Sequence, residues 1–121
     1  MTTRRLLIVD DVPQVRSELR TLLSLAGNIE IVGEAVNGLE AVTQAAILQP
    51  DVVLMDLEMP LMNGYEATRK IKLQFPTCRV IALTVNDYAE AVERARQSGV
   101  DAFIVKGSPM TDLVQKILEE D

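Results

Sequence analysis

The sequence predicts an α/β domain with three layers, in which helices cover both faces of a doubly wound, five-stranded parallel sheet. Uninterrupted apolar runs are typical of strands that are buried on both faces. Segments with apolar residues at helical spacing separate these runs, and this alternation indicates parallel strands joined by right-handed helical crossovers. The 121 residues are enough for one such domain, whereas a closed eight-unit barrel needs roughly twice that length.

The strands are predicted from apolar runs that end at polar residues. One segment, Ile29–Val32, alternates apolar and polar residues and therefore suits an edge of the sheet. The other runs are continuously apolar and are typical of strands buried on both faces. They are Leu6–Val9, Val52–Met55, Val80–Leu83 and Ala102–Val105.

The helices are predicted from apolar periodicity and from the residues that stop it. Glycine after the last turn and proline beyond it are ordinary helix ends, and serine before a first-turn proline is an ordinary start. The predicted segments are Val15–Ala26 before Gly27, Leu39–Ala46 before Pro50, Ala67–Ile71 before Pro76, Tyr88–Ala95 before Gly99, and Met110–Ile117 with Ser108 as cap and Pro109 in its first turn.

The composition excludes several classes of chemistry. The formal net charge is −6, which argues against direct binding of nucleic acid because phosphate backbones require clustered Lys and Arg. Cys78 is the only cysteine, so neither an internal disulfide nor a thiolate metal cluster can form. Histidine is absent, which removes Ser-His-Asp and Cys-His catalysis and imidazole zinc sites. The remaining chemistry uses carboxylates, hydroxyls and amines.

The sequence carries no signal for a membrane. No apolar run approaches the roughly 20 residues that span a bilayer. The apolar run at Leu6–Val9 is shorter than the core of about 7 residues or more found in a signal peptide. We therefore expect a cytoplasmic protein without a membrane partner.

Polar residues follow four of the predicted strands. Asp10 and Asp11 follow the first strand, Asp56 the third, Thr84 closes the fourth, and Lys106 follows the fifth. The carboxyl ends of parallel strands share one edge of the sheet, where ligands of this fold class bind. We therefore expect these side chains to converge, although they are far apart in sequence.

This set of side chains suits phosphoryl transfer. Clustered carboxylates need a cation, and oxygen ligands favour Mg²⁺ or the similar Mn²⁺. Aspartate can act as a nucleophile that becomes an aspartyl phosphate, while Lys106 would neutralise phosphoryl oxygens and Thr84 would donate a hydrogen bond to one of them. Singly, each residue has an ordinary reading: Asp11 as a helix cap, Asp56 as a turn residue, Thr84 as structural and Lys106 as solvated.

The chain resembles the receiver domain of two-component response regulators from Arg5 to Leu118. The motifs that carry the resemblance are Leu6–Asp11, Asp51–Pro60, Met62–Gly64, Ile81–Thr84 and Gly99–Lys106. The resemblance implies a flavodoxin-like sheet of order 2-1-3-4-5 and Asp56 as the phosphoacceptor. It also implies that Asp11 binds Mg²⁺ directly, Asp10 acts through water, and the backbone carbonyl of Glu58 completes the protein ligands.

The same resemblance implies a switch and its partners. The phosphoryl donor would be a sensor histidine kinase or a phosphotransfer protein, which agrees with the absence of histidine here. Thr84 would move toward the phosphoryl group and Phe103 would rotate inward, although by sequence alone Phe103 is an ordinary core aromatic. The surface of the fourth helix, fifth strand and fifth helix would then control an output domain or partner protein.

A subclass is also indicated. Asn86 after Thr84, together with the Lys106–Pro109 run, resembles receivers attached to a C-terminal helix-turn-helix, which implies transcription regulation. Gly107 replaces the proline common in the family, and this argues against a cis peptide after Lys106. Residues 1–121 are predicted to be a single receiver domain without an output domain. Whether the chain forms a homodimer is left open.

Three other functions are alternatives to a phosphorylated receiver. A receiver that is never phosphorylated would serve only as an interaction module. An aspartyl-phosphate hydrolase would use Glu58, two residues after Asp56, as its general acid, but such enzymes carry the nucleophile on the first strand. A nucleotide switch fails because the chain has no phosphate-binding P-loop. We therefore expect a regulator, with no enzymatic activity beyond phosphorylating itself from small donors and dephosphorylating itself.

Overall fold

The chain folds around one parallel sheet whose strands lie in the order β2-β1-β3-β4-β5. The structure is a computed structural model and describes residues 3–85 and 88–119. The parallel sheet with this strand order confirms the predicted fold class and topology. The strands are β1 (Arg4–Val9), β2 (Ile29–Ala35), β3 (Val52–Asp56), β4 (Arg79–Thr84) and β5 (Ala102–Val105), and the helices are α1 (Pro13–Leu23), α2 (Gly38–Leu48), α3 (Gly64–Gln74), α4 (Ala89–Ser98) and α5 (Met110–Leu118).

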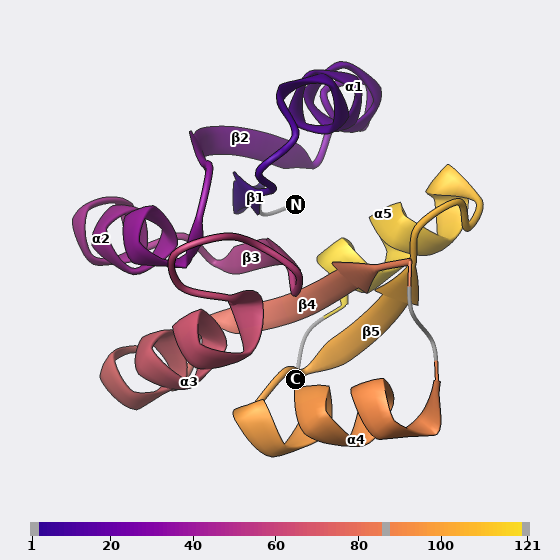
Figure 1. Cartoon of the computed structure of the whole chain (residues 1–121). Helices are drawn as coiled ribbons and strands as arrows, with labels where there is room; N and C mark the ends of the chain where they lie inside the picture. The colour runs from indigo at the N-terminus through magenta and orange to yellow at the C-terminus, as the bar shows by residue number, and fades with distance from the viewer. Residues whose placement is uncertain (1–2, 86–87, 120–121) are drawn as a thin grey trace.

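The helices cover the two faces of the sheet unequally. Helices α1 and α5 lie on one face, and α2, α3 and α4 lie on the other (Figure 1). Within β1 the side chains alternate accordingly: Leu6 and Ile8 belong to the core beneath α1 and α5, while Leu7 and Val9 belong to the core beneath α2 and α3. All four are buried, which explains why this strand is continuously apolar. In the described part of the chain no helix is long and apolar enough to cross a membrane.

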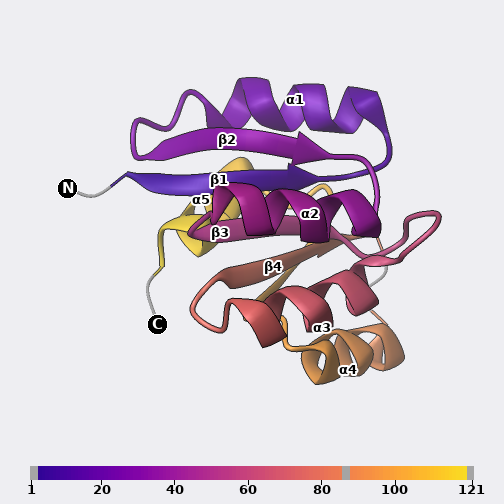
Figure 2. The ribbon, with the colours of Figure 1, turned by 90° about the vertical axis from the view of Figure 1, so that its left-hand side faces the viewer.

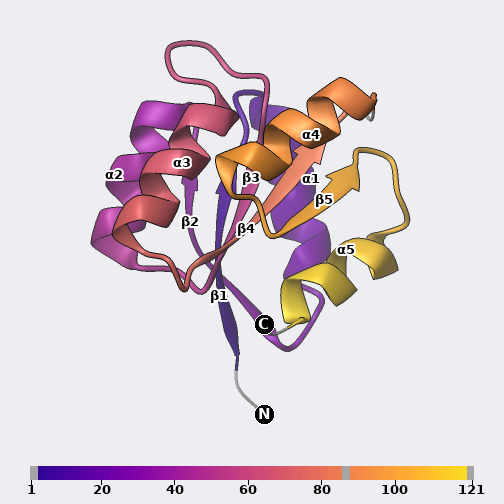
Figure 3. The ribbon, with the colours of Figure 1, turned by 90° about the horizontal axis from the view of Figure 1, so that it is seen from below.

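The five strands run in one direction, so their carboxyl ends form a single edge. Figure 2 shows the arrowheads of the strands pointing the same way, with the β3–α3 loop projecting beyond them. Figure 3 shows the same loop from below, standing clear of the sheet at that edge. The residues that follow β1, β3 and β5 are therefore brought to a common region. This edge is the place where the sequence predicts a site.

The predicted end of α1 and the predicted cap of α5 are wrong. Helix α1 ends at Leu23 rather than Ala26, because the next residues form tighter turns in which the Ala26 N–H donates to the Leu23 carbonyl at 3.1 Å. Helix α5 is not capped by Ser108. The cap position is Pro109, which makes no side-chain hydrogen bond. The Ser108 hydroxyl donates to the Val105 carbonyl at 2.6 Å rather than to the start of the helix.

Candidate functional site

Three carboxylates meet at the carboxyl edge of the sheet. One oxygen of each of Asp10, Asp11 and Asp56 can be chosen so that all three atoms lie within 4.8 Å of one another. Asp10 and Asp56 are buried, with 1% and 4% of their surface exposed, and Asp11 is more open to solvent. Asp56 is the last residue of β3, and the other two directly follow β1. The expected convergence of these acids is confirmed.

Lys106 provides a positive charge at this cluster. Its Nζ lies 3.1 Å from Asp10 Oδ2 and 3.8 Å from Asp56 Oδ2. The backbone N–H of Lys106 donates to the Thr84 carbonyl at 2.7 Å, which extends the pairing of β4 and β5 to the site. One lysine therefore faces a cluster of three carboxylates. The local charge is negative when all of these groups are ionised.

The pKa of Asp56 reflects both its burial and the surplus of negative charge in this cluster. Burial, followed by the negative charge of Asp10, raises the pKa of Asp56 from 3.8 to about 7. The Glu58 backbone N–H, which donates to Asp56 Oδ1 at 3.1 Å, and the charge of Lys106 act in the opposite direction and lower the pKa. Burying two carboxylates beside one amine is costly, and a bound divalent cation would relieve that cost.

Protein groups hold Asp10 on several sides. Its Oδ1 accepts the Val12 N–H at 2.9 Å, its Oδ2 faces Lys106, and its backbone carbonyl accepts a bond from Arg16 Nη1 at 2.7 Å. The Asp10 N–H in turn donates to the Ala35 carbonyl on β2. The cap position of α1 is Val12, without a side-chain bond, so the reading of Asp11 as a helix cap is wrong.

The loop after Asp56 is fixed by close backbone packing at two glycines. The Gly64 N–H donates to the Leu57 carbonyl at 3.0 Å, and the Gly38 N–H donates to the Met62 carbonyl at 2.9 Å. A Cβ atom on Gly64 would lie 2.1 Å from the Asp56 carbonyl oxygen, and one on Gly38 would lie 2.3 Å from the Met62 carbonyl oxygen. Neither position has room for a side chain, so the loop is anchored against the starts of α2 and α3.

Sequence reasoning did not assign these glycines a role, although a signal was present. Each follows an asparagine that caps its helix: Asn37 Oδ1 accepts the Glu40 N–H at 2.8 Å, and Asn63 Oδ1 accepts the Glu66 N–H at 2.9 Å. The repeated Asn-Gly pair therefore marks two helix starts that approach the same loop. A search for a capping residue followed by glycine would have found both.

The two residues predicted to act as a switch lie on neighbouring strands. Thr84 is buried at the end of β4. Phe103 is partly buried and packs against the cluster of Leu57, Tyr65, Ala82 and Ala95, which joins α3 and α4 to the sheet. Their motion stays a prediction. The side chain of Glu58 is exposed.

The backbone conformation of Gly107 shows how the chain continues after β5. Its φ is +93°, a left-handed value that favours glycine, and the described residues contain no cis peptide bond. The peptide between Lys106 and Gly107 is therefore trans, as the sequence suggested. Asn86, the other residue used to assign a subclass, lies outside the described residues.

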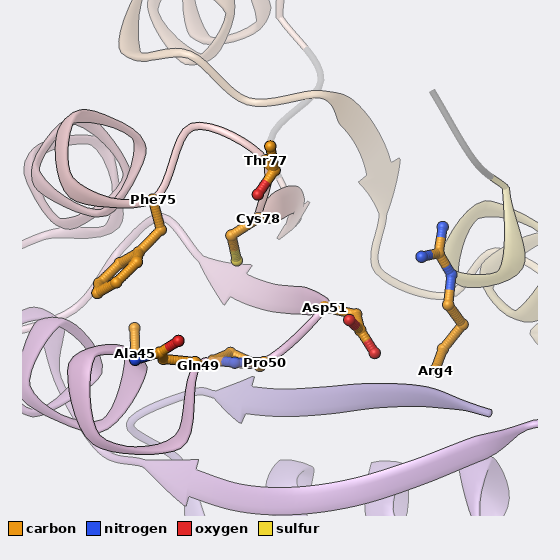
Figure 4. Close-up of a pocket in the computed structure, with 8 residues that line it drawn as sticks. All are labelled: Arg4, Ala45, Gln49, Pro50, Asp51, Phe75, Thr77 and Cys78. Atoms are coloured by element: carbon orange, nitrogen blue, oxygen red, sulfur yellow. The ribbon is translucent and has the colours of Figure 1, made fainter. Parts of the chain in front are cut away.

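A separate pocket lies at the opposite, amino-terminal edge of the sheet. Figure 4 shows this pocket with Phe75 on one side and Arg4 on the other, and with the sulfur of Cys78 directed into it. Asp51 also lines it, but its carboxylate accepts the Arg5 N–H at 2.9 Å. Burial raises the pKa of the Cys78 thiol to about 11, so the thiol stays protonated near neutral pH. This pocket lies apart from the three acids and Lys106.

Comparison with known proteins agrees with the geometry. Residues 6–118 match the family described as the response regulator receiver domain. The response regulator protein VraR of Staphylococcus epidermidis is 41% identical over 113 residues, which cover 93% of this chain and 54% of VraR. This chain thus spans about half the length of such curated relatives.

Solved structures give the same result. A LuxR-family two-component response regulator from Aurantimonas superposes with a TM-score of 0.91 at 33% identity, over 96% of this chain and 83% of the other. The CheX–CheY–BeF3–Mg²⁺ complex from Borrelia burgdorferi gives 0.86 at 25% identity, over 96% of this chain and 87% of the other. This similar protein was therefore solved in a complex that contains BeF3 and Mg²⁺.

Proposed function

Because the chain belongs to the response regulator receiver domain family, whose members are phosphoacceptor regulators rather than catalytic enzymes, we propose that Asp56 accepts a phosphoryl group and acts as a signalling switch. The observation that carries this proposal is the convergence of Asp10, Asp11 and Asp56 within 4.8 Å, beside Lys106. The phosphoryl donor would be a sensor histidine kinase or a phosphotransfer protein.

The donor set fits a hard divalent cation, Mg²⁺ or Mn²⁺. All candidate ligands are oxygens, and burial together with the negative charge of Asp10 raises the pKa of Asp56, a cost that a bound cation would offset. Asp11 and Asp56 would bind the ion directly, Asp10 would act through water, and the backbone carbonyl of Glu58 would complete the protein ligands. When bound, the cation would neutralise oxygens of the incoming phosphoryl group.

The residues of the chain have distinct roles in this reaction. An Asp56 carboxylate oxygen forms a bond to phosphorus as the phosphorus–nitrogen bond of a phosphohistidine donor breaks, and the leaving imidazole takes up a proton. The Glu58 N–H holds Asp56 Oδ1 in place. Lys106, with Nζ already 3.8 Å from Asp56 Oδ2, would stabilise the charge on the phosphoryl oxygens, and Thr84 would donate to one of them.

Phosphorylation would alter the surface formed by α4, β5 and α5. Thr84 closes β4 and Phe103 lies on β5 against the cluster that supports α4, so movement of both would change how α4 packs. Relatives of about twice this length and a LuxR-family neighbour support transcription regulation through an additional output domain. We propose an output of this kind. We also propose that the protein is cytoplasmic and that residues 1–121 form a single receiver domain.

Intact mass spectrometry tests the acceptor directly. Incubation with acetyl phosphate and Mg²⁺ is expected to add the mass of one phosphoryl group, because the small donor uses the same carboxylate and cation. Chelation of the metal is expected to prevent the addition. Asp56→Asn is expected to abolish it, whereas the matched change Asp112→Asn, at an exposed residue in the first turn of α5, is expected to leave it intact.

Other results would contradict the proposal. An unchanged mass in the presence of Mg²⁺ would favour the alternative of an interaction module that is never phosphorylated. A phosphoryl group that persists in Asp56→Asn would place the acceptor elsewhere. Steady turnover of p-nitrophenyl phosphate by the unmodified chain would favour the hydrolase.

A further inference from the structure

We propose that Arg16 is a positioning residue for the cation site, because its guanidinium ties the backbone of Asp10 to Glu34 on β2. This inference rests on the proposed function, since it assumes that the acids bind a divalent cation. Arg16 does not belong to the acidic cluster, and its effect on the cation would act through the segment that carries Asp10 and Asp11.

The contacts of Arg16 join three elements. Its Nη1 donates to the Asp10 carbonyl at 2.7 Å, and its Nε donates to Glu34 Oε1 at 3.1 Å. The side chain of Arg16 is only 14% exposed. Arg16 lies in the first turns of α1, Asp10 follows β1, and Glu34 lies on β2. The guanidinium therefore fixes the direction in which the chain leaves β1, immediately before Asp11.

The position of Arg16 is unusual for a residue that serves only the helix. Acidic side chains are favoured near a helix N-terminus, and basic ones are disfavoured there, because of the helix dipole. The first turn of α1 nevertheless contains no acidic residue, and Arg16 follows closely. The favourable contacts that offset this cost are the ones to Asp10 and Glu34. Their geometry suits the planar fork of arginine, which can bind two acceptors in fixed directions.

Removal of Arg16 would have two opposite effects on the affinity for the cation, one through its charge and one through its hydrogen bonds. The positive charge of Arg16 repels a divalent cation, so loss of that charge alone would tighten metal binding. Loss of the fork would free the β1–α1 segment and would weaken binding. Supporting groups around metal ligands typically change affinity by about 10-fold or more when they are removed. The direction of the change therefore distinguishes a positioning residue from a nearby charge.

Arg20 provides a matched control. Its Nε donates to the other oxygen of the same carboxylate, Glu34 Oε2, at 2.6 Å, but its side chain is 47% exposed. Arg20→Met and Arg16→Met remove the same charge from the same partner. Of these two arginines, Arg16 is the one whose side chain donates to the Asp10 carbonyl. Arg16→Lys keeps the charge but cannot reproduce the two directed bonds.

The test is titration of the purified chain with Mn²⁺, with free Mn²⁺ measured by electron paramagnetic resonance and the fold monitored by urea denaturation. We expect Arg16→Met and Arg16→Lys to bind Mn²⁺ about 10-fold more weakly, and Arg20→Met to stay within about twofold of the unmodified chain. The affinity is compared where each variant is fully folded, so a general loss of stability does not produce this pattern.

The outcomes separate this inference from the proposed function. If the unmodified chain binds Mn²⁺ but Arg16→Met binds equally or more tightly, the positioning role is wrong and the cation site survives. If Arg20→Met weakens binding as much as Arg16→Met, the effect belongs to Glu34 and its charge balance, and the role is again wrong. If the unmodified chain does not bind Mn²⁺, both this inference and the proposed cation site fail.

Discussion

Replacement of Gly64 with alanine is expected to lower the free energy of unfolding by about 3 kcal/mol, the upper end of the usual cost of overpacking. The added Cβ would lie 2.1 Å from the carbonyl oxygen of Asp56 and 2.8 Å from Leu57 Cα. Both obstacles are backbone atoms, so no side chain can rotate away to make room. The end of β3 or the start of α3 must move, and Asp56 moves with it.

Gly27→Ala is the matched control for this prediction. A Cβ at Gly27 meets no atom within 4 Å, so the same chemical change is expected to alter stability by less than about 1 kcal/mol. Urea denaturation of both variants measures the difference. Equal stability of Gly64→Ala and the unmodified chain would show that the loop after Asp56 is not anchored by this close approach.

In the metal-free protein, the ionisation of Asp56 is expected to lower stability as the pH rises from about 4 to about 7. Burial and the neighbouring charge of Asp10 raise the pKa of Asp56 from 3.8 to about 7 in the folded state. Between these values the folded state holds a proton that the unfolded state has released, so the free energy of unfolding falls with increasing pH. This contribution of Asp56 is expected to total about 4 kcal/mol, because a pKa difference of one unit between the folded and unfolded states corresponds to about 1.4 kcal/mol.

Asp56→Asn isolates this contribution, because every other titrating group is common to both proteins. In the absence of divalent cations the variant is expected to match the unmodified chain near pH 4 and to exceed its stability near pH 8. Saturating Mg²⁺ is expected to reduce the pH dependence of the unmodified chain, since the cation favours the ionised carboxylate. A stability difference between the two proteins that does not change with pH would mean that Asp56 is not destabilised by its surroundings.

The sequence was sufficient to predict the sheet and the meeting of the acids. The apolar runs of β1, β3 and β4 are buried on both faces of a sheet covered by helices, as continuous apolarity predicts, whereas β5 lies at the edge and is only partly buried. Once the strands are parallel, Asp10, Asp56 and Lys106 must reach the same edge. Helix ends were harder to predict, because the turns after Leu23 and the bond from Ser108 to Val105 are local alternatives that periodicity does not reveal.

The supports around the site could not be predicted in the same way. Arg16 and Glu34 are 18 positions apart, and only the pairing of β1 with β2, with Ile8 opposite Glu34, brings Glu34 near α1. The clash expected at Gly64 depends on how closely α3 approaches the end of β3. Both features arise from the packing of one element on another, for which residue type and spacing give little information.

The central claim is that Asp56 lies beside a bound cation, and crystallography with Mn²⁺ and anomalous scattering tests it most directly. One ion is expected at the carboxyl edge of the sheet, bound by carboxylate oxygens of Asp11 and Asp56 and by the Glu58 carbonyl at about 2.1 Å, close to the distances of Mg²⁺. An empty acidic cluster in crystals grown with saturating Mn²⁺, or an ion bound without Asp56, would contradict it.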